Sequence, residues 1–195
     1  MENNSSQVSC RACGAGVSPA SSICDYCGNP VRITTLKSTV DLSKPLLMKY
    51  VKSYENDAED ENSNVSLGLI FLQLGQFDKA NQRFDDAIND DPVNSEAYFY
   101  KAVATLAGKK PFVCSRNVIN KVLSQLGAAR ELDSQPLFSY LSSIVKYDYF
   151  ARKNFKISPD YKDDLNDAHN SGVALGDIDA LLSVVRVDLP DELKI

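Results

Sequence analysis

The sequence predicts a mainly α-helical protein that begins with a small cysteine-rich module built from β-hairpin turns. Four cysteines form two close pairs within the first 30 residues. Apolar residues then recur at helical spacing over most of the chain, and Ser or Pro stands where several of these helical segments begin. The chain has 195 residues, which is enough for the module and one helical domain.

The cysteine pairs share one pattern, Cys-x-x-Cys-Gly, at residues 10–14 and 24–28. Two thiolates separated by two residues can hold one metal ion from a tight turn, and the glycine allows the backbone conformation of that turn. Four sulfurs complete a tetrahedron and leave no position for water or substrate. The spacing therefore predicts one structural Zn²⁺ ion, with the ligands Cys10, Cys13, Cys24 and Cys27.

Two other interpretations of the cysteines are a thiol–disulfide redox pair and two structural disulfides in a secreted chain. A thioredoxin-like motif belongs to a strand–helix context, whereas the glycines and prolines of residues 14–30 predict loops. The segment 1–6, Met-Glu-Asn-Asn-Ser-Ser, has neither the basic region nor the apolar run of a secretory signal. We therefore expect a cytoplasmic protein with reduced cysteines.

The segment 10–31 resembles the small zinc-ribbon domains found at the ends of many prokaryotic proteins. The resemblance rests on the four cysteines, their glycines, and an expected minimal core of Val17, Ile23 and Val31. We place the ribbon at residues 1–33 and expect a tether at residues 34–44. Residues 1–33 carry two basic and two acidic side chains, which disfavours nucleic-acid binding by the ribbon alone.

Helical patterning fills residues 45–195. Ser43 and Pro45 are start signals for a first helix, whose apolar stripe runs from Leu46 to Tyr54. The next 34 residues, 61–94, resemble a tetratricopeptide repeat. The positions that match the signature of that family are Leu67, Gly68, Phe71, Gly75, Phe77, Ala80, Phe84, Ala87 and Pro92.

The remaining sequence predicts a second, degenerate repeat at 95–136 and further helices at 137–195. The second helix of the degenerate repeat is expected to be late and long, and to end before Pro136. Later helices are expected to begin at Pro136, at Pro159 and with Asp177 as a cap. Because a single repeat cannot bury its own apolar face, the resemblance implies an antiparallel helical array.

Helical repeats of this family bind partners on a concave surface. The resemblance implies six inward positions, all apolar, which we expect to form a groove for a partner helix or extended segment. Alternatively, the chain's own helix at 46–54 fills the groove, since apolar stripes usually form core. The Lys, Arg and Asn side chains of a chaperone-type carboxylate clamp are absent from these positions, which are Val65, Leu69, Leu72, Phe99, Val103 and Leu106.

The net charge and its distribution limit the classes of partner that the protein can bind. The net charge of −5 disfavours a general polyanion binder, and no apolar run is long enough for a membrane span. Residues 93–156, however, carry 10 basic and 4 acidic side chains. Basic residues such as Lys101, Lys109 and Arg152 lie near aromatic ones there, which keeps an RNA- or ribosome-associated role as an alternative.

Signs of catalytic chemistry are weak in the sequence. His169 is the single histidine, and Cys114 has no partner placed by sequence to activate it. We therefore expect a non-enzymatic adaptor or assembly factor whose partner is a protein. The remaining alternative is a regulatory subunit or redox sensor that releases zinc when its cysteines are oxidised.

Overall fold

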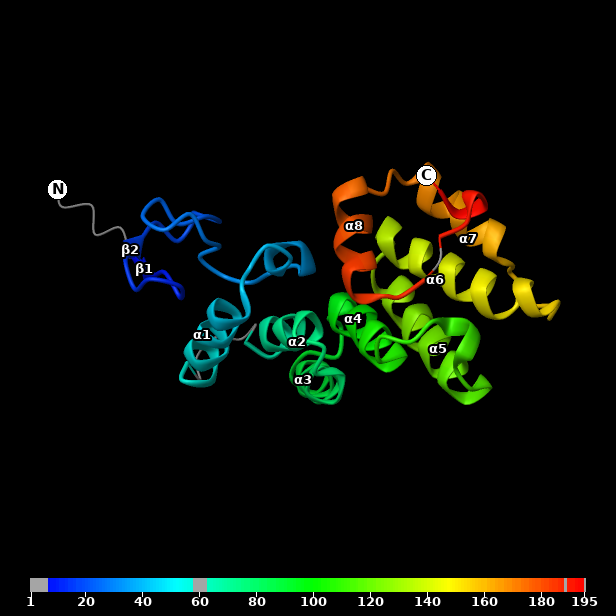
Figure 1. The fold of residues 1–195 in the computed structure, drawn as a ribbon, viewed down its shortest axis with the longest axis horizontal. Helices are drawn as coiled ribbons and strands as arrows, with labels where there is room; N and C mark the ends of the chain where they lie inside the picture. The colour runs from blue at the N-terminus through cyan, green and yellow to red at the C-terminus, as the bar shows by residue number, and fades with distance from the viewer. Residues whose placement is uncertain (1–6, 58–62, 188, 195) are drawn as a thin grey trace.

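The computed structural model describes residues 7–57, 63–187 and 189–194 and is mainly α-helical, with a small antiparallel sheet near the N terminus (Figure 1). The sheet consists of β1 (Val8–Ser9) and β2 (Gly16–Val17), which pair Val8 with Val17. This architecture confirms the predicted fold class.

The first helix, α1 (Lys44–Glu55), begins as the sequence predicts. Ser43 is its N-cap and has an extended backbone, and proline stands in the first turn, where its missing N–H costs nothing. The helix buries one apolar stripe, formed by Leu47, Tyr50, Val51 and Tyr54.

The predicted repeat contains an antiparallel helix pair, α2 (Ser63–Gln73) and α3 (Phe77–Asp90), while residues 61 and 62 lie outside the described part of the chain. Gly75 turns the chain between the helices with φ of +70°. A Cβ atom on Gly68 would lie 2.4 Å from the Phe84 ring. Glycine at position 68 therefore lets the two helices approach closely, as the repeat pattern predicts.

The second pair is α4 (Ser95–Leu106) and α5 (Arg116–Leu132), joined through the 3₁₀ turn η2 (Pro111–Val113). Side-chain oxygens cap both helices: Asn94 accepts from the N–H of Ala97, and Ser115 accepts from the N–H of Val118. The helix α5 is long and ends at Leu132, with Asp133 as its C-cap. The prediction of a late, long second helix is confirmed.

The C-terminal part contains α6, α7 and α8. The helix α6 (Pro136–Tyr149) begins at the predicted proline and leads into η3 (Ala151–Lys153). The helix α7 (Tyr161–Asn170) begins two residues after Pro159, because the Asp160 carboxylate caps it by accepting from the N–H groups of Lys162 and Asp163.

The predicted start of the last helix is wrong. The helix α8 (Leu175–Val184) has Ala174 at its N-cap, and Asp177 lies inside the first turn rather than capping it. An acidic side chain is favourable both at the N-cap and inside the first turn, because the N-terminal turn carries a partial positive charge. The sequence therefore does not distinguish between these two positions for Asp177. A last 3₁₀ turn, η4 (Asp191–Leu193), follows.

The segment expected as a tether is packed into the fold instead. It contains η1 (Leu36–Thr39), in which Leu36 and Thr39 are buried. Just before it, the carbonyl of Ile33 accepts a hydrogen bond of 2.6 Å from Ser66 on α2, and η1 packs against both α2 and α8. The linker predicted at 34–44 is therefore an ordered segment that packs against the helices, while the division into domains at residues 33 and 45 stays a prediction.

Buried side chains form one continuous hydrophobic cluster that runs from Cys10 to Leu193. The N-terminal module thus shares its core with the helical array. In the part of the chain that the structure describes, no helix has the length and apolar character needed to cross a membrane.

Candidate metal centre and neighbouring surfaces

The two cysteine pairs form turns with the same hydrogen-bond pattern. In the first, the N–H of Gly14 donates to the carbonyl of Cys10 at 2.7 Å, and in the second, the N–H of Gly28 donates to that of Cys24 at 2.8 Å. Both glycines have positive φ, +80° and +69°. A side chain would be strained at either position, which explains the glycine after each pair.

The two turns bring four sulfur atoms together. All four Sγ atoms lie within 4.8 Å of one another; the Cys10–Cys27 distance is 3.8 Å and the Cys13–Cys24 distance is 3.7 Å. An ion held by four thiolates at about 2.3 Å in a tetrahedron places its sulfurs about 3.8 Å apart. The predicted ligands therefore form a cluster that fits a tetrahedral metal ion.

The thiols of this cluster differ in acidity. The backbone N–H of Asn29, followed by its side-chain amide, donates toward Sγ and lowers the pKa of Cys27 to about 6. The pKa of Cys13 is raised to about 11: the N–H of Ala15 lowers it, but desolvation and the other sulfurs together outweigh that effect. Four thiolates in this space need a cation between them.

The module is docked on α1 through Arg11. Its guanidinium donates to the Ser53 carbonyl and hydroxyl at 3.4 and 3.2 Å, and to the Asp57 carboxylate at 2.8 Å. The same guanidinium lies 4.0 Å from the centroid of the Tyr54 ring. Arg11 stands between the first two cysteine ligands, so the metal turn itself contacts the helical array.

Two tyrosines of α1 complete the docking surface. The Tyr54 hydroxyl accepts a hydrogen bond of 2.8 Å from the N–H of Ile33, and the Tyr50 hydroxyl donates to the carbonyl of Pro30. Burial, followed by the nearby cysteines, raises the pKa of Tyr50 well above its ordinary value. Both hydroxyls hold the end of the module against the helix.

One predicted member of the module's core is wrong. Val17 and Val31 are buried, but the side chain of Ile23 is 51% exposed, and Tyr26 beside it is 75% exposed. Ile23 pairs with Pro30 in an isolated antiparallel bridge. Because docking on α1 covers the other side of the module, its core does not need Ile23, which instead lines a surface groove of about 730 Å³ with Pro30 and Leu42.

The six predicted inward residues do not form an open surface. Each is at most 8% exposed. The array covers this face with its own elements, since α2 packs against α1, η1 and α8, and Phe99 stacks on Phe138 with ring centroids 4.7 Å apart. These residues are therefore core, as the alternative proposed, but α1 is not the only element that covers them: α1, η1 and α8 pack against α2, while α3 and α5 pack against α4. The six residues are Val65, Leu69, Leu72, Phe99, Val103 and Leu106.

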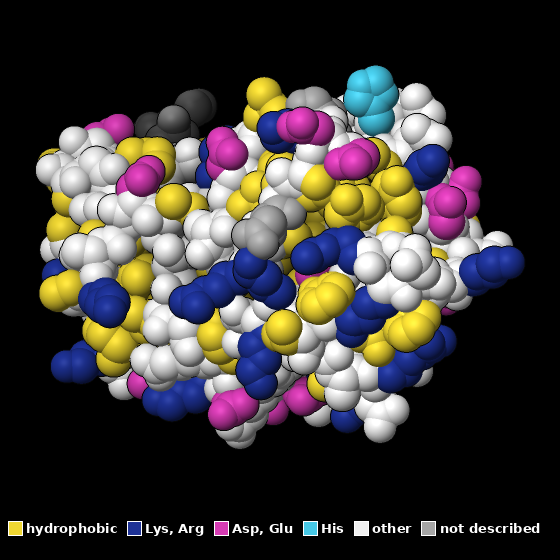
Figure 2. Space-filling model, turned by 45° about the vertical axis from the view of Figure 1, so that its right-hand side comes forward, with side chains coloured by type: hydrophobic (Ala, Val, Ile, Leu, Met, Phe, Trp, Pro, Cys, Tyr) yellow, Lys and Arg dark blue, Asp and Glu magenta, His cyan; other side chains and the backbone are white. Residues whose placement is uncertain are grey.

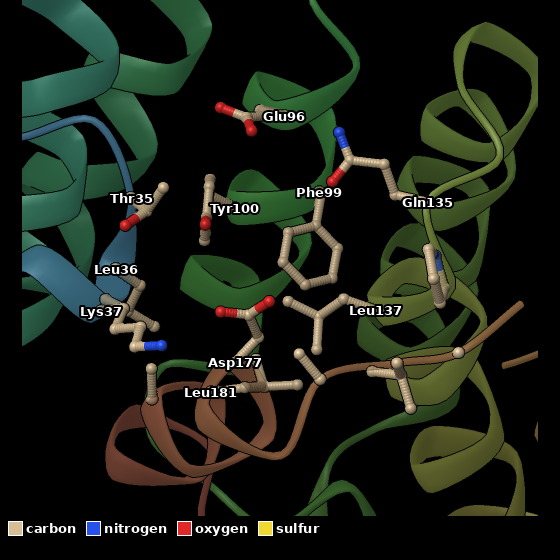
Figure 3. Close-up of a pocket in the computed structure, with 15 residues that line it drawn as sticks. Thr35, Leu36, Lys37, Glu96, Phe99, Tyr100, Gln135, Leu137, Asp177 and Leu181 are labelled. Carbon is tan, nitrogen blue, oxygen red and sulfur yellow. The ribbon is translucent and has the colours of Figure 1, made fainter. Parts of the chain in front are cut away.

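A cavity of about 180 Å³ remains between η1, α4 and α8. Figure 3 shows its polar groups: the Asp177 carboxylate points from α8 toward the space between Tyr100 and Phe99, and Glu96 lies in the first turn of α4. Burial, followed by the charge of Asp133, raises the pKa of Glu96. The cavity thus contains a carboxyl group that is costly to ionise.

A buried ionic cluster joins α6 to α7. Asp164 is fully buried, and its carboxylate lies 2.6 Å from Lys146 Nζ and 2.9 Å from a guanidinium nitrogen of Arg130. The Ser142 hydroxyl donates to the same carboxylate at 2.5 Å. Both oxygens of Asp164 have partners, so the carboxylate does not resemble an unpaired catalytic acid. Loss of one member of the cluster would leave a buried charge without its partner.

The other reactive side chains have ordinary surroundings. The Cys114 thiol contacts the carbonyl of Lys110 at 3.5 Å, and burial raises its pKa. A raised pKa reduces the thiolate fraction at neutral pH, which opposes activation as a nucleophile. His169 lies in the last turn of α7.

Comparison of the chain with protein-family models, curated proteins and solved structures gives no match in any of the three. Function must therefore be argued from the cysteine cluster and from the exposed surfaces.

Proposed function

We propose that the protein is a non-catalytic adaptor or assembly factor in which one structural Zn²⁺ ion holds an N-terminal ribbon against a tetratricopeptide-like helical array. The observation that carries the proposal is the cluster of four sulfurs at tetrahedral spacing. Four protein ligands occupy all coordination positions of a tetrahedral ion, so the metal supports the fold and has no position left for a substrate.

Zinc is the ion that the donor set favours. Four soft thiolates in a tetrahedron suit Zn²⁺ or iron, whereas Mg²⁺ and Ca²⁺ need oxygen ligands. Protein purified from zinc-supplemented cells is expected to contain one zinc per chain by elemental analysis. Cys13→Ser should lower this content, while Cys114→Ser should leave it unchanged; iron in place of zinc, or equal loss in both variants, would contradict the assignment.

The groove beside the second cysteine turn is the surface on which we place the protein partner. Its apolar lining includes Ile23, Pro30 and Leu42, and Arg32 and Asp41 add charges at its edges. No backbone hydrogen bond of Ile23 is found among the described residues. A strand edge with unused N–H and C=O groups beside an apolar groove suits an extended peptide segment, which can add as a further strand.

A photo-reactive cross-linker placed at Ser22, an exposed residue that lines the groove, tests this surface in the native cell. Cross-linking there should trap one protein whose cross-linked residues lie in an extended segment. The same cross-linker at Leu132, an exposed residue of α5, serves as the control. Recovery of the same proteins from both positions, or of none from Ser22, would contradict the adaptor function.

A matched pair of variants then measures the contribution of the groove with the purified partner. Ile23→Asp should weaken binding at least about tenfold, because it places a charge where the partner buries apolar surface. Val93→Asp changes an exposed apolar residue between α3 and α4 and should leave binding unchanged. Equal effects of the two variants would place the partner elsewhere.

A further inference from the structure

Two basic segments that are distant in the sequence meet where α5 begins and α6 ends. The first, 109–116, contains η2, and the second, 149–156, contains η3. The N–H of Phe112 donates to the Asp148 carboxylate at 2.7 Å, and η2 packs against α6. This contact fixes the two segments side by side.

Charge is concentrated on the surface that the two segments form, which we call the basic–aromatic patch. Neither segment contains an acidic residue. Of the neighbouring carboxylates, Asp148 is buried and forms an ion pair with Arg152, while Asp160 lines the adjoining recess and accepts hydrogen bonds from the first turn of α7. Figure 2 brings this end of the molecule forward and shows Lys and Arg side chains gathered with hydrophobic ones between them. The cations of the patch are Lys109, Lys110, Arg116, Arg152, Lys153 and Lys156.

Aromatic rings hold several of these cations in place. Lys153 Nζ lies 3.8 Å from the ring centroid of Tyr149 and 4.8 Å from that of Phe112, and Arg152 lies 4.6 Å from the latter. A cation over an aromatic face is attracted to the ring and loses less freedom when it binds an anion. The patch is therefore partly ordered before any ligand arrives.

An apolar recess of about 520 Å³ opens beside the cations. Phe150, Phe155, Ile157 and Tyr161 line it, and Lys156 lies at the same recess. The Phe155 side chain is 47% exposed. Since aromatic side chains stack on nucleobases of any sequence, a recess with exposed aromatic carbon next to several cations can take a base and its phosphates together.

We infer that the basic–aromatic patch binds single-stranded nucleic acid, with phosphates on its lysine and arginine side chains and one base in the recess at Phe155. A peptide rich in Asp and Glu would match the cations but would have no use for the aromatic recess. A duplex would offer phosphates but no free base. The negative net charge of the chain does not oppose this binding, because the contacts are local and much of the acidic surface lies on other elements.

Fluorescence anisotropy of a fluorescein-labelled 12-nucleotide oligouridine RNA, titrated with the full metal-loaded chain, tests the inference. If about four cations contact phosphates, the affinity should fall about 50-fold between 50 and 200 mM salt. The double variant Lys109→Glu with Lys156→Glu should weaken binding at least about tenfold. It should also reduce the slope of log affinity against log salt concentration by the amount expected for the loss of about two phosphate contacts. Lys44→Glu with Lys52→Glu, the same charge change on α1, is the control.

Phe155→Ala tests the recess separately from the charges. It should weaken RNA binding about fivefold or more while the salt dependence stays that of the unmodified protein, because a lost stacking contact releases no counterions. Circular dichroism confirms that the variant is folded.

Five results would overturn the inference. Equal loss of binding in the α1 control would show nonspecific charge attraction. Equal affinity for a duplex, or no effect of Phe155→Ala, would exclude the base in the recess. Competition by polyglutamate at equal charge concentration, or preferential binding to vesicles of anionic lipid, would identify a different class of ligand.

Discussion

The guanidinium of Arg11 lies 4.0 Å from the centroid of the Tyr54 ring, so the turn that carries the first two cysteine ligands rests directly on α1. The same guanidinium is bonded to Ser53 and Asp57. A single side chain thus joins the candidate metal centre to the helical array, and the two parts are expected to respond to changes together.

Arg11→Ala should destabilise the protein by about 1 to 3 kcal/mol, because it removes charge-assisted hydrogen bonds and a cation–π contact from a largely buried site. Urea unfolding measures the change. Arg32→Ala removes an exposed arginine from the same module and should change stability by less than about 0.5 kcal/mol. If both variants unfold at the same urea concentration as the unmodified protein, Arg11 does not secure the docking.

Gly68→Ala should destabilise the fold by about 1 to 3 kcal/mol, because the added methyl group would meet the Phe84 ring between α2 and α3. Gly127→Ala provides the matched control in α5, where a Cβ atom meets nothing within 4 Å. The control should gain about 0.5 to 1 kcal/mol from helix propensity. Thermal unfolding of both variants gives the comparison, and a stabilised Gly68→Ala would contradict the close approach of the helices.

Asp164→Asn should cost about 3 to 5 kcal/mol, because it leaves the buried ammonium of Lys146 without its charged partner. Asp167→Asn removes the other carboxylate that Arg130 contacts, which is 60% exposed, and should cost less than about 1 kcal/mol. Chemical unfolding distinguishes the two. Similar costs would mean that the ionic cluster between α6 and α7 is not effectively buried.

Glu96→Gln should change the pH dependence of stability. The pKa of Glu96 is raised in the folded chain by burial, followed by the charge of Asp133, so the unfolded chain ionises this group first as the pH rises. The folded state therefore loses stability, relative to the Gln variant, as the pH rises from below the unfolded pKa, about 4.3, through the folded one.

The measurement for Glu96 is the difference in unfolding free energy between the variant and the unmodified protein at pH 4 and pH 8. This difference should move in favour of the variant at pH 8. Glu131→Gln, at an exposed position of α5, is the control for loss of one negative charge. A difference that is the same at both pH values would show that the cavity does not affect Glu96.

Features carried by local sequence were predicted well. The cysteine turns need only residues 10–14 and 24–28, and the helices from α1 to α6 follow apolar periodicity and start signals. The close approach of α2 and α3 at Gly68 was also predictable, because the repeat pattern places this glycine opposite an aromatic residue.

Features that depend on contacts between distant segments were missed. Arg11 meets residues more than forty positions away, and nothing in the sequence near Arg11 marks it as an anchor. The burial of η1 depends on its packing against α2 and α8, and the exposure of Ile23 follows from docking of the module on α1. The basic residues were noticed in the sequence, but their convergence around Phe112 requires the fold.

Removal of the metal, followed by hydrogen–deuterium exchange and mass spectrometry, tests the central claim that the metal module is part of the helical fold. Chelation should remove amide protection from residues 7–33 and also from α1, while α5 and α6 keep theirs. Arg11 of the module and Tyr50 and Tyr54 of α1 join these two parts, whereas no such bond links the module to α5 or α6 among the described residues. Loss of protection confined to residues 7–33, with α1 unchanged, would show that the module is only tethered and would contradict the account.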